Sequence, residues 1–323
     1  MTIPLNDVTW EQLPDMPVAK WEPASLVLND KLYVLGGYED NVTSSRRLDV
    51  FDPEDRSWTQ LQDCPSKISH VDLVDGDTGF WFAGGMKDKP ERSVKDHIIA
   101  EVWHFDVDSD RYTAAPLLPG PRAGGALERV GDRLHYIAGL MADRDTDSPD
   151  HFVFDLAEWS STGCAEWTKA APLPTPRNQH SVGVINGQIY IIGGQFNHDS
   201  QQLDQTLVDI YDPASDTWVE GPPLPVAHSH SEGATFVHQN RIWMVGGHST
   251  PEGGKKGFCS DVVTLREGEE WEVTCHLPKP ISSPASKIIK DNLYVAGGWD
   301  GRTDENKDWV MSPEVWVTNV ENL

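Results

Sequence analysis

The chain lacks most of the features that mark secreted, membrane or nucleic-acid-binding proteins. Its 323 residues include only four cysteines, far apart and without a Cys-x-x-Cys pair, so neither a disulfide framework nor a zinc knuckle is indicated. No stretch approaches the roughly 20 apolar residues of a membrane-spanning helix. The first residues show no basic segment followed by an apolar run, as a secretory signal would. We therefore expect a cytoplasmic protein with reduced thiols.

Positive charge is also scarce. The chain has 26 lysines and arginines against 51 aspartates and glutamates, a formal net charge of −25. Such a chain repels nucleic acid and anionic membranes at long range. We expect neither as a partner, and we expect a monomer.

What the chain does have is a repeat. A glycine doublet that ends an apolar strand recurs six times at intervals of about 50 residues, with alanine replacing the first glycine of the third copy. The doublets are Gly36-Gly37, Gly84-Gly85, Ala138-Gly139, Gly193-Gly194, Gly246-Gly247 and Gly297-Gly298. A period of this length is typical of propellers and repeat arrays.

The fourth copy shows the unit most clearly. Residues 181–185 and 188–192 form two apolar strands around the tight turn Asn186-Gly187. After the doublet and a polar loop, residues 206–211 predict a third strand, and a fourth begins at Trp218. Four antiparallel strands make one blade of a propeller.

The sixth copy ends at residues 314–318 without a fourth strand, and the segment around Trp10 matches the missing piece. We therefore predict an all-β, six-bladed propeller in one domain, residues 1–323, closed by an N-terminal strand that completes the last blade and removes the exposed edges. The expected blades are residues 20–62, 66–115, 121–170, 176–221, 227–275, and 281–318 with 8–13.

Paired glycines, a strand such as Leu207–Tyr211 ending at Asp212-Pro213, and then Trp218 resemble the kelch repeat over essentially the whole chain. The architecture is most similar to single-domain bacterial kelch proteins of the sialic acid mutarotase type. Kelch propellers also include interaction modules, plant specifier proteins and a copper oxidase, so the resemblance does not choose the function.

Cations gather where the innermost strands begin. Counting sixteen residues back from the doublets gives Lys20, Arg122, Arg177, His230 and Ile281, and the longer turn of the second blade brings in Lys67. One interpretation is a ring that recognises anions, which resembles the arginine-bearing mouth with which some kelch domains hold acidic peptides. The alternative is loop packing, in which each cation has a carboxylate partner.

Histidines lie on the same predicted face: His70, His180, His198, His228, His230 and His248. If the segment around His228, His230 and Glu232 is extended, its alternate side chains share one side and offer ligands for a divalent metal. The alternative is that they hydrogen-bond the channel or a ligand. Glu232 with His230 or His180 are also the candidate acid–base groups.

Three aromatic residues, Trp21, Tyr38 and Trp299, are expected near the connection between the last and first blades, either stacking on a ligand or packing between blades. The predicted ligand-binding residues are Lys20, Trp21, Tyr38, Lys67, His70, Arg122, Arg177, His180, Gln195, His198, His248 and Trp299.

The favoured function is binding of an anionic ligand, either an acidic small molecule or sugar or an acidic protein segment, at the mouth of the channel. A mutarotase or epimerase acting on a carboxylated sugar is the alternative. A metal-dependent hydrolase or lyase is a third hypothesis. No cofactor is expected, apart from the metal that this third hypothesis requires.

Overall fold

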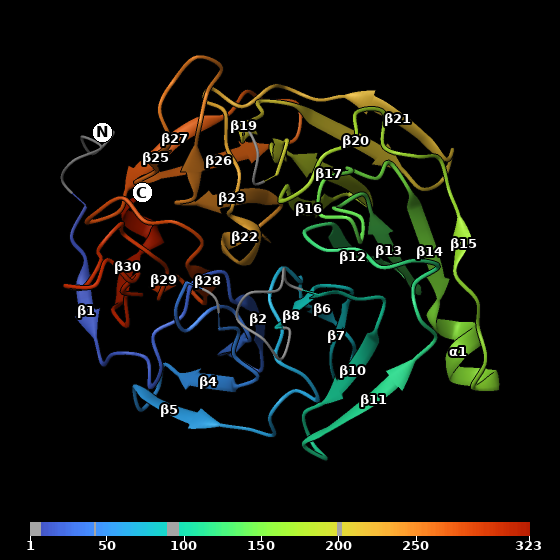
Figure 1. Cartoon of the computed structure of the whole chain (residues 1–323), viewed down its shortest axis with the longest axis horizontal. Coiled ribbons are helices and arrows are strands. Elements are labelled where there is room, and N and C mark those ends of the chain that lie inside the picture. The colour runs from blue at the N-terminus through green and yellow to red at the C-terminus, as the bar shows by residue number, and fades with distance from the viewer. Residues whose placement is uncertain (1–7, 42, 89–96, 199–201) are drawn as a thin grey trace.

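Six four-stranded antiparallel sheets surround a central channel in the computed structural model of the chain (Figure 1), which describes residues 8–41, 43–88, 97–198 and 202–323. The prediction of an all-β, six-bladed propeller is confirmed. Among the described residues, the α-helix is α1 (Leu156–Thr162), inserted before the last strand of blade three. None of the described helices is long and apolar enough to cross a membrane.

The blades are built from innermost to outermost strand as follows. Blade one is β2 (Ala24–Leu28), β3 (Lys31–Leu35), β4 (Leu48–Asp52) and β5 (Ser57–Gln60); blade two is β6 (Val74–Asp75), β7 (Gly79–Ala83), β10 (Val102–Asp106) and β11 (Arg111–Ala115); blade three is β12 (Ala126–Val130), β13 (Arg133–Ile137), β14 (His151–Asp155) and β15 (Thr168–Lys169). Blade four is β16 (Ser181–Ile185), β17 (Gln188–Ile192), β20 (Val208–Asp212) and β21 (Thr217–Glu220); blade five is β22 (Thr235–His238), β23 (Arg241–Val245), β26 (Asp261–Arg266) and β27 (Glu272–His276); blade six is β28 (Ala285–Ile289), β29 (Asn292–Ala296), β30 (Val315–Asn319) and β1 (Glu11–Leu13).

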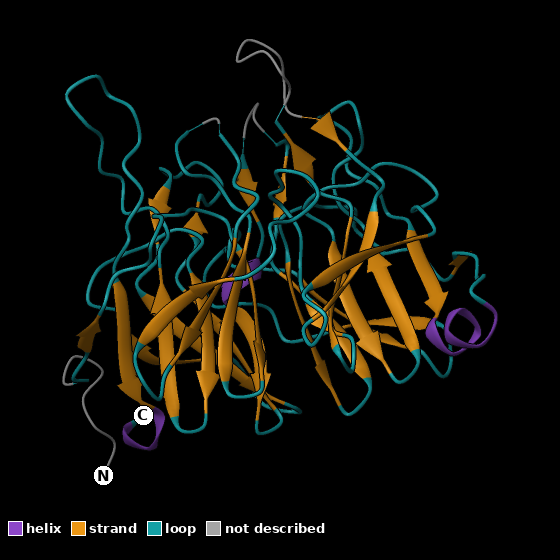
Figure 2. Cartoon of the chain, turned by 90° about the horizontal axis from the view of Figure 1, so that it is seen from below, coloured by secondary structure: helices purple, strands orange, loops and turns teal. Residues whose placement is uncertain are grey.

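The two faces of the ring differ in loop length (Figure 2). Long loops join the second and third strands of the blades on what we call the upper face. The connections on the lower face are short, except for the segment that carries α1 in blade three. Three of these long loops carry two-stranded ribbons: β8 (Met86–Lys87) with β9 (His97–Ile98), β18 (Gln195–Phe196) with β19 (Leu203–Asp204), and β24 (His248–Ser249) with β25 (Gly257–Phe258).

Local signals placed the strands well. In blade four the first two strands have the predicted bounds, and Asn186 and Gly187 between them have φ of 51° and 80°, as a two-residue hairpin turn requires. The third strand is β20 (Val208–Asp212), two residues later at its start than predicted.

The ring is closed by the N-terminal strand. β1 pairs antiparallel with β30, with Leu13 opposite Val315 and Glu11 opposite Val317. The two ends of the chain therefore share blade six (Figure 1), which confirms the predicted closure.

Tryptophans join neighbouring blades at the rim. In five blades an indole Nε1 donates a hydrogen bond to a backbone carbonyl at the end of the preceding blade's outermost strand. The pairs are Trp10–His276 at 3.0 Å, Trp58–Pro14 at 3.4 Å, Trp167–Pro116 at 3.0 Å, Trp218–Ala171 at 2.9 Å and Trp271–Pro222 at 2.9 Å. The predicted role of these aromatics between sheets is confirmed.

The alanine in the third doublet is accompanied by a longer hydrogen bond to the next blade. Ala138 has φ of 62°, a left-handed conformation that glycine adopts without cost. At the equivalent Gly84, an added Cβ would lie 2.4 Å from the carbonyl oxygen of Arg122 in the next blade. Ala138 carries that methyl, and the bond from Gly139 N to the Arg177 carbonyl is 3.3 Å long, against 2.7 Å in the equivalent bond of the preceding blade.

Candidate functional site

Described residues line two cavities along the channel. The upper chamber, about 400 Å³, opens on the face with the long loops; it is lined by Trp21, Glu22, Tyr38, Asn41, His70, Arg144, Gln179, Gln195, His198, Gln202, His230, Lys256 and Trp309. The lower chamber, about 540 Å³, is lined by the innermost strands and includes Asp72, Glu128, Glu232 and Lys287. A constriction of about 20 Å³ shares Glu22 with the upper chamber and Glu232 with the lower. A space of this size holds little more than one water molecule.

Near the constriction, one residue from each blade contributes to a ring around the channel, which we call the belt. Its members are Glu22, His70, Gly124, Gln179, His230 and Ser283, with φ of 54°, 58°, 57°, 47°, 57° and 44°. Backbone hydrogen bonds link them around the channel: Glu22 N to Ser283 O, Ser283 N to His230 O, His230 N to Gln179 O, Gln179 N to Gly124 O, and Gly124 N to His70 O, at 2.7–3.4 Å. Left-handed backbone is unfavourable for residues other than glycine, and these inter-blade bonds hold it in place.

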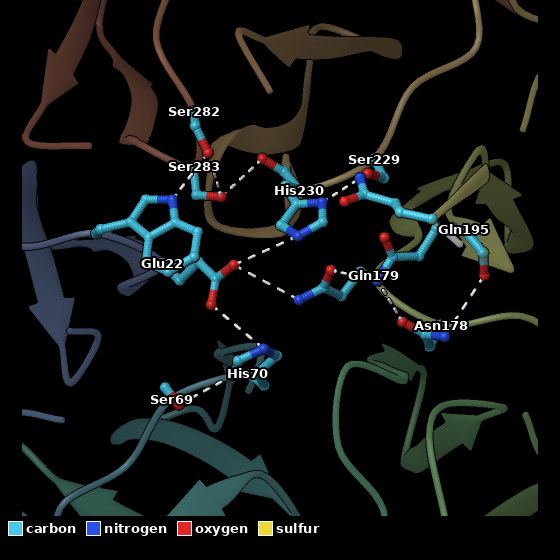
Figure 3. A network of polar contacts seen from close by, with 12 residues as sticks. Glu22, Ser69, His70, Asn178, Gln179, Gln195, Ser229, His230, Ser282 and Ser283 are labelled. Carbon is cyan, nitrogen blue, oxygen red and sulfur yellow. Dashed lines mark hydrogen bonds and ion pairs between the residues drawn. The ribbon is translucent and has the colours of Figure 1, made fainter. Parts of the chain in front are cut away.

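Glu22 is the centre of the belt (Figure 3). Its Oε2 lies 3.2 Å from Nε2 of His70, and its Oε1 lies 3.6 Å from Nε2 of His230. Gln179 Nε2 donates to Oε1 at 3.5 Å. Sequence reasoning missed Glu22, because a single glutamate in a loop carries no pattern that distinguishes it from the other acidic residues.

Hydrogen bonds on the Nδ1 side of His230 orient its imidazole ring. Its Nδ1 lies 2.6 Å from Oγ of Ser229, and that hydroxyl donates to Oδ1 of Asp204 at 2.7 Å. The ring of His248 packs against the His230 ring at a tilt of 30°, with centroids 4.0 Å apart. Burial, and secondly the neighbouring His248, hold the pKa of His230 well below its usual value, so the imidazole is neutral at pH 7.

A chain of amides forms one side of the floor. Gln195 Nε2 donates to Oδ1 of Asn178 at 3.0 Å and to Oε1 of Gln179 at 2.8 Å. Asn178 Nδ2 in turn donates to Oδ1 of Asp147 at 2.5 Å. Gln195 is 2% exposed, and its Oε1 accepts no hydrogen bond from the described part of the chain.

The opposite wall is aromatic. The Trp21 ring packs against Tyr38 and Trp309, with centroids 5.6 and 5.2 Å apart. Trp299, which the sequence placed at the mouth, is buried behind Trp309 and stacked on it at 4.0 Å. The aromatic residues therefore pack together, as one of the two interpretations requires, and Trp21, Tyr38 and Trp309 also line the upper chamber.

The predicted cationic ring is paired with carboxylates. Lys20 contacts Asp49 at 2.8 Å, Arg177 contacts Asp209 at 2.7 Å, and Arg122 contacts Asp150. All three cations are at most 5% exposed. Lys67 is exposed and lies 3.3 Å from Asp88. The positive charge is therefore neutralised within the blades, as the loop-packing alternative requires, and none of the four lines the upper chamber.

Counting back from the doublets also misaligned two blades. The second N–H of each doublet donates to a backbone carbonyl of the next blade. For the doublets of blades one to six, the acceptors belong to Ile68, Arg122, Arg177, His228, Ile281 and Lys20. The equivalent residues are therefore Ile68 rather than Lys67, and His228 rather than His230. His230 is a belt residue instead, because blade five contains a 3₁₀ turn, η1 (Glu232–Ala234), before its first strand.

The proposed metal ligands point to different surroundings. His228 Nε2 bonds the carbonyl of Gly246, His230 faces Glu22, and Glu232 lies between the constriction and the lower chamber. The segment is not extended, because His230 is left-handed and Glu232 begins η1. Within the described ranges, no group of three or more His, Cys, Asp or Glu side chains is arranged to hold a metal ion.

The other predicted histidines divide into two groups. His70 and His198 line the upper chamber with Trp21, Tyr38 and Gln195. His180 and His248 are fully buried and do not line it. Burial, and secondly Arg177, lower the pKa of His180 to about 3, which suits a neutral buried ring better than an acid–base group.

Buried and half-buried carboxyl groups line the lower chamber: Asp72 is buried, and Glu128 and Glu232 are half-buried. Burial raises the pKa of Asp72 and of Glu128 to about 7 and that of Glu232 to about 8, and it lowers the pKa of Lys287 to about 7. A carboxyl whose pKa is raised on folding stabilises the fold below its unfolded pKa of about 4, and this contribution is lost as pH rises through the folded pKa. Between pH 5 and 6 the carboxyls dominate, because Lys287 stays protonated in both states below its folded pKa of about 7.

Asp72→Asn is therefore expected to stabilise the protein more at pH 7.5 than at pH 5, by a difference of about 1–2 kcal/mol. Urea unfolding at the two pH values measures this difference. Asp75→Asn, at an exposed position that also lines the lower chamber, is the control. An equal gain at both pH values would show that burial of Asp72 does not set the pH dependence.

Comparisons with known proteins agree with the fold. The chain matches the KLHDC2/KLHL20/DRC7 Kelch-repeats domain over residues 117–298 and the Kelch motif over residues 22–65. It is 22% identical to Kelch repeat-containing protein At3g27220 of Arabidopsis thaliana, over 99% of this chain and 78% of that protein. It is 29% identical to Kelch-like protein terF of Aspergillus terreus, over 63% of this chain and 45% of that protein.

Other relatives are longer than this chain. Kelch-like protein 26 of Danio rerio is 23% identical over 88% of this chain but only 45% of its own length. Among solved structures, that of YjhT superposes with a TM-score of 0.74 at 15% identity, covering 93% of this chain and 95% of that one. Kelch-repeat proteins often mediate protein–protein interaction. The sheet topology, the closure of the ring and the family match together show that the chain belongs to the kelch-repeat family.

Proposed function

We propose that the upper chamber binds a small carboxylated molecule, such as an acidic sugar. The observation that carries the proposal is the cavity itself: about 400 Å³, within the range of small-molecule sites, with aromatic rings on one wall and polar groups on the floor. Trp21, Tyr38 and Trp309 supply flat apolar surface for the carbon face of a ring. Arg144 and Lys256 line the same chamber and supply positive charge for a carboxylate.

The anion-binding role thus moves from the predicted ring to two residues in the long loops. Lys20, Arg122 and Arg177 are buried in pairs with aspartates and offer no charge to the chamber. An acidic protein segment is the other ligand that the sequence suggested. The volume of the chamber lies within the usual range of small-molecule sites, so a small molecule is favoured.

D-glucuronate is expected to stabilise the protein against thermal unfolding, and Lys256→Gln is expected to weaken its binding about three- to tenfold with a reduced salt dependence. Isothermal titration at two salt concentrations measures both. Lys255→Gln is the matched control, because Lys255 is exposed and does not line the chamber. Equal weakening by the two substitutions would contradict a carboxylate site at Lys256.

A second candidate function is catalysis of mutarotation, favoured by the position of Glu22 between two imidazoles. Glu22 accepts the proton of the anomeric hydroxyl while the bond from the anomeric carbon to the ring oxygen breaks and a carbonyl forms. His70 Nε2–H protonates the departing ring oxygen, and the reverse steps close either anomer. In this proposal Glu22 and His70 take the acid–base roles that the sequence suggested for Glu232 with His230 or His180.

Freshly dissolved α-D-glucuronate is expected to reach its anomeric equilibrium faster with the protein than in buffer. Glu22→Gln is expected to lower this acceleration about 100-fold, the usual contribution of a general base. Proton NMR of the anomeric signals follows the exchange. Ser283→Ala, another belt substitution, is the control. An exchange rate equal to that of buffer would leave binding as the function.

A further inference from the structure

The carboxylates next to the chamber floor determine which floor atoms donate hydrogen bonds and which accept them. An ionised aspartate or glutamate only accepts hydrogen bonds, so it fixes the direction of every bond in a chain that ends on it. Two such chains lead into the upper chamber. One starts at Asp204 and the other joins Asp147 to Glu22.

The first chain fixes the tautomer of His230. Asp204 accepts from the Ser229 hydroxyl, so that hydroxyl has no second hydrogen to give. The bond between Ser229 Oγ and His230 Nδ1 must then use a hydrogen on Nδ1. Because the imidazole is neutral, Nε2 carries a lone pair. The separation of 3.6 Å between Nε2 and Glu22 Oε1 fits two acceptors facing each other with no hydrogen between them.

The second chain fixes Gln195. Asn178 must turn its amide nitrogen to Asp147, and Gln179 must turn its own to Glu22, so both present oxygens to Gln195. Gln195 gives its two N–H hydrogens to these oxygens. Its Oε1 therefore remains as an acceptor and receives no hydrogen bond from the described residues. The Gln195 residue as a whole is 2% exposed.

We propose that the upper chamber selects ligands that donate hydrogen bonds, with Glu22, His230 Nε2 and Gln195 Oε1 acting as acceptors for ligand hydroxyl groups. The inference rests on the proposed function, since it assumes that the ligand occupies this chamber, and it narrows the ligand to a polyhydroxylated molecule. A buried acceptor left without a donor costs binding energy, so a ligand of the same shape without hydroxyls binds less well.

Three six-membered-ring probes separate the inference from the proposed function: D-glucuronate has hydroxyls and a carboxylate, D-glucose has hydroxyls only, and cyclohexanecarboxylate has a carboxylate only. D-glucuronate is expected to bind at least about tenfold more tightly than cyclohexanecarboxylate. Equal binding of these two would overturn the inference and leave the carboxylate site standing. If D-glucose and D-glucuronate bind with equal affinity, and both bind more tightly than cyclohexanecarboxylate, the inference stands. The proposed function would then be wrong in requiring a carboxylate on the ligand. Binding by none would overturn both.

Ser229→Ala tests the polarity without a ligand. The substitution removes the acceptor behind Nδ1, so the hydrogen of His230 is expected to move to Nε2, where Glu22 accepts it. Long-range ¹H–¹⁵N NMR of the imidazole distinguishes the tautomers: Nδ1–H is expected in the parent and Nε2–H in the variant, with loss of the preference for D-glucuronate. Ser283→Ala is the control, since Ser283 Oγ bonds the His230 carbonyl rather than its ring. An Nε2–H tautomer in the parent protein would overturn the proposal.

Discussion

Replacing Arg177 by methionine is expected to lower the free energy of unfolding by about 3–5 kcal/mol, the cost of breaking a buried ion pair from one side. Arg177 is fully buried and donates to Asp209 and to the carbonyls of Gly193, Thr175 and Ile191. Its removal leaves the Asp209 carboxylate in the core without its counter-charge. Urea unfolding followed by tryptophan fluorescence measures the loss.

Two further variants test whether the loss of stability comes from breaking the buried ion pair between Arg177 and Asp209. Lys67→Met removes a cation that is 46% exposed as a side chain and pairs with Asp88, and it is expected to cost at most about 1 kcal/mol. Arg177→Met combined with Asp209→Leu replaces both charges with apolar groups and is expected to recover much of the loss. Similar losses for Arg177→Met and Lys67→Met would refute the structural role of the buried pair.

Removal of residues 1–13 is expected to destabilise the ring by about 5 kcal/mol or more. The deletion takes away β1, the buried Leu13 and the Trp10 bond to His276 in blade five, and deletion of a buried leucine or tryptophan side chain alone costs about 2–5 kcal/mol. It also exposes the edge of β30 as a template for another chain. Urea unfolding measures the loss, and light scattering measures association.

Gln12→Ala is the matched control for this deletion, because Gln12 is an exposed residue of β1 and the substitution keeps the backbone pairing with Trp316. Its unfolding midpoint is expected to stay close to that of the parent. A synthetic peptide spanning residues 8–16 is expected to restore part of the truncated protein's stability. If the truncated chain unfolds at the parent's urea concentration and stays monomeric, β1 does not close the ring.

The fold could be predicted because its signals are local and repeated. Asn186-Gly187 requires a hairpin turn by its own conformational preference, and a tryptophan such as Trp218 needs the gap between two sheets for its size. Each signal occurs in several blades, so an irregular copy such as Ala138 did not obscure the period. Closure by β1 followed from one missing strand at one end and one extra strand at the other.

The site was harder to predict because it depends on pairing between distant residues. The sequence shows that Arg177 and Asp209 are charged but not that they neutralise each other, so the buried cations were assigned to a ligand. Belt residues such as Glu22 are defined by a left-handed backbone, which tertiary hydrogen bonds impose and residue type does not reveal. Histidine and aromatic positions were better indicated, since Trp21, Tyr38, His70 and His198 do line the upper chamber.

The belt separates what holds the ring together from what the ring recognises. Its five backbone bonds from blade to blade do not depend on which side chain is present, whereas blades one and two are joined at this level by the contact of Glu22 Oε2 with His70 Nε2. One position is a glycine and another is a serine, while the acid, the amide and the two imidazoles occupy the other four. The belt side chains on the chamber floor can therefore be substituted one blade at a time. A library varied only at these six positions would explore new ligand chemistries on an unchanged scaffold.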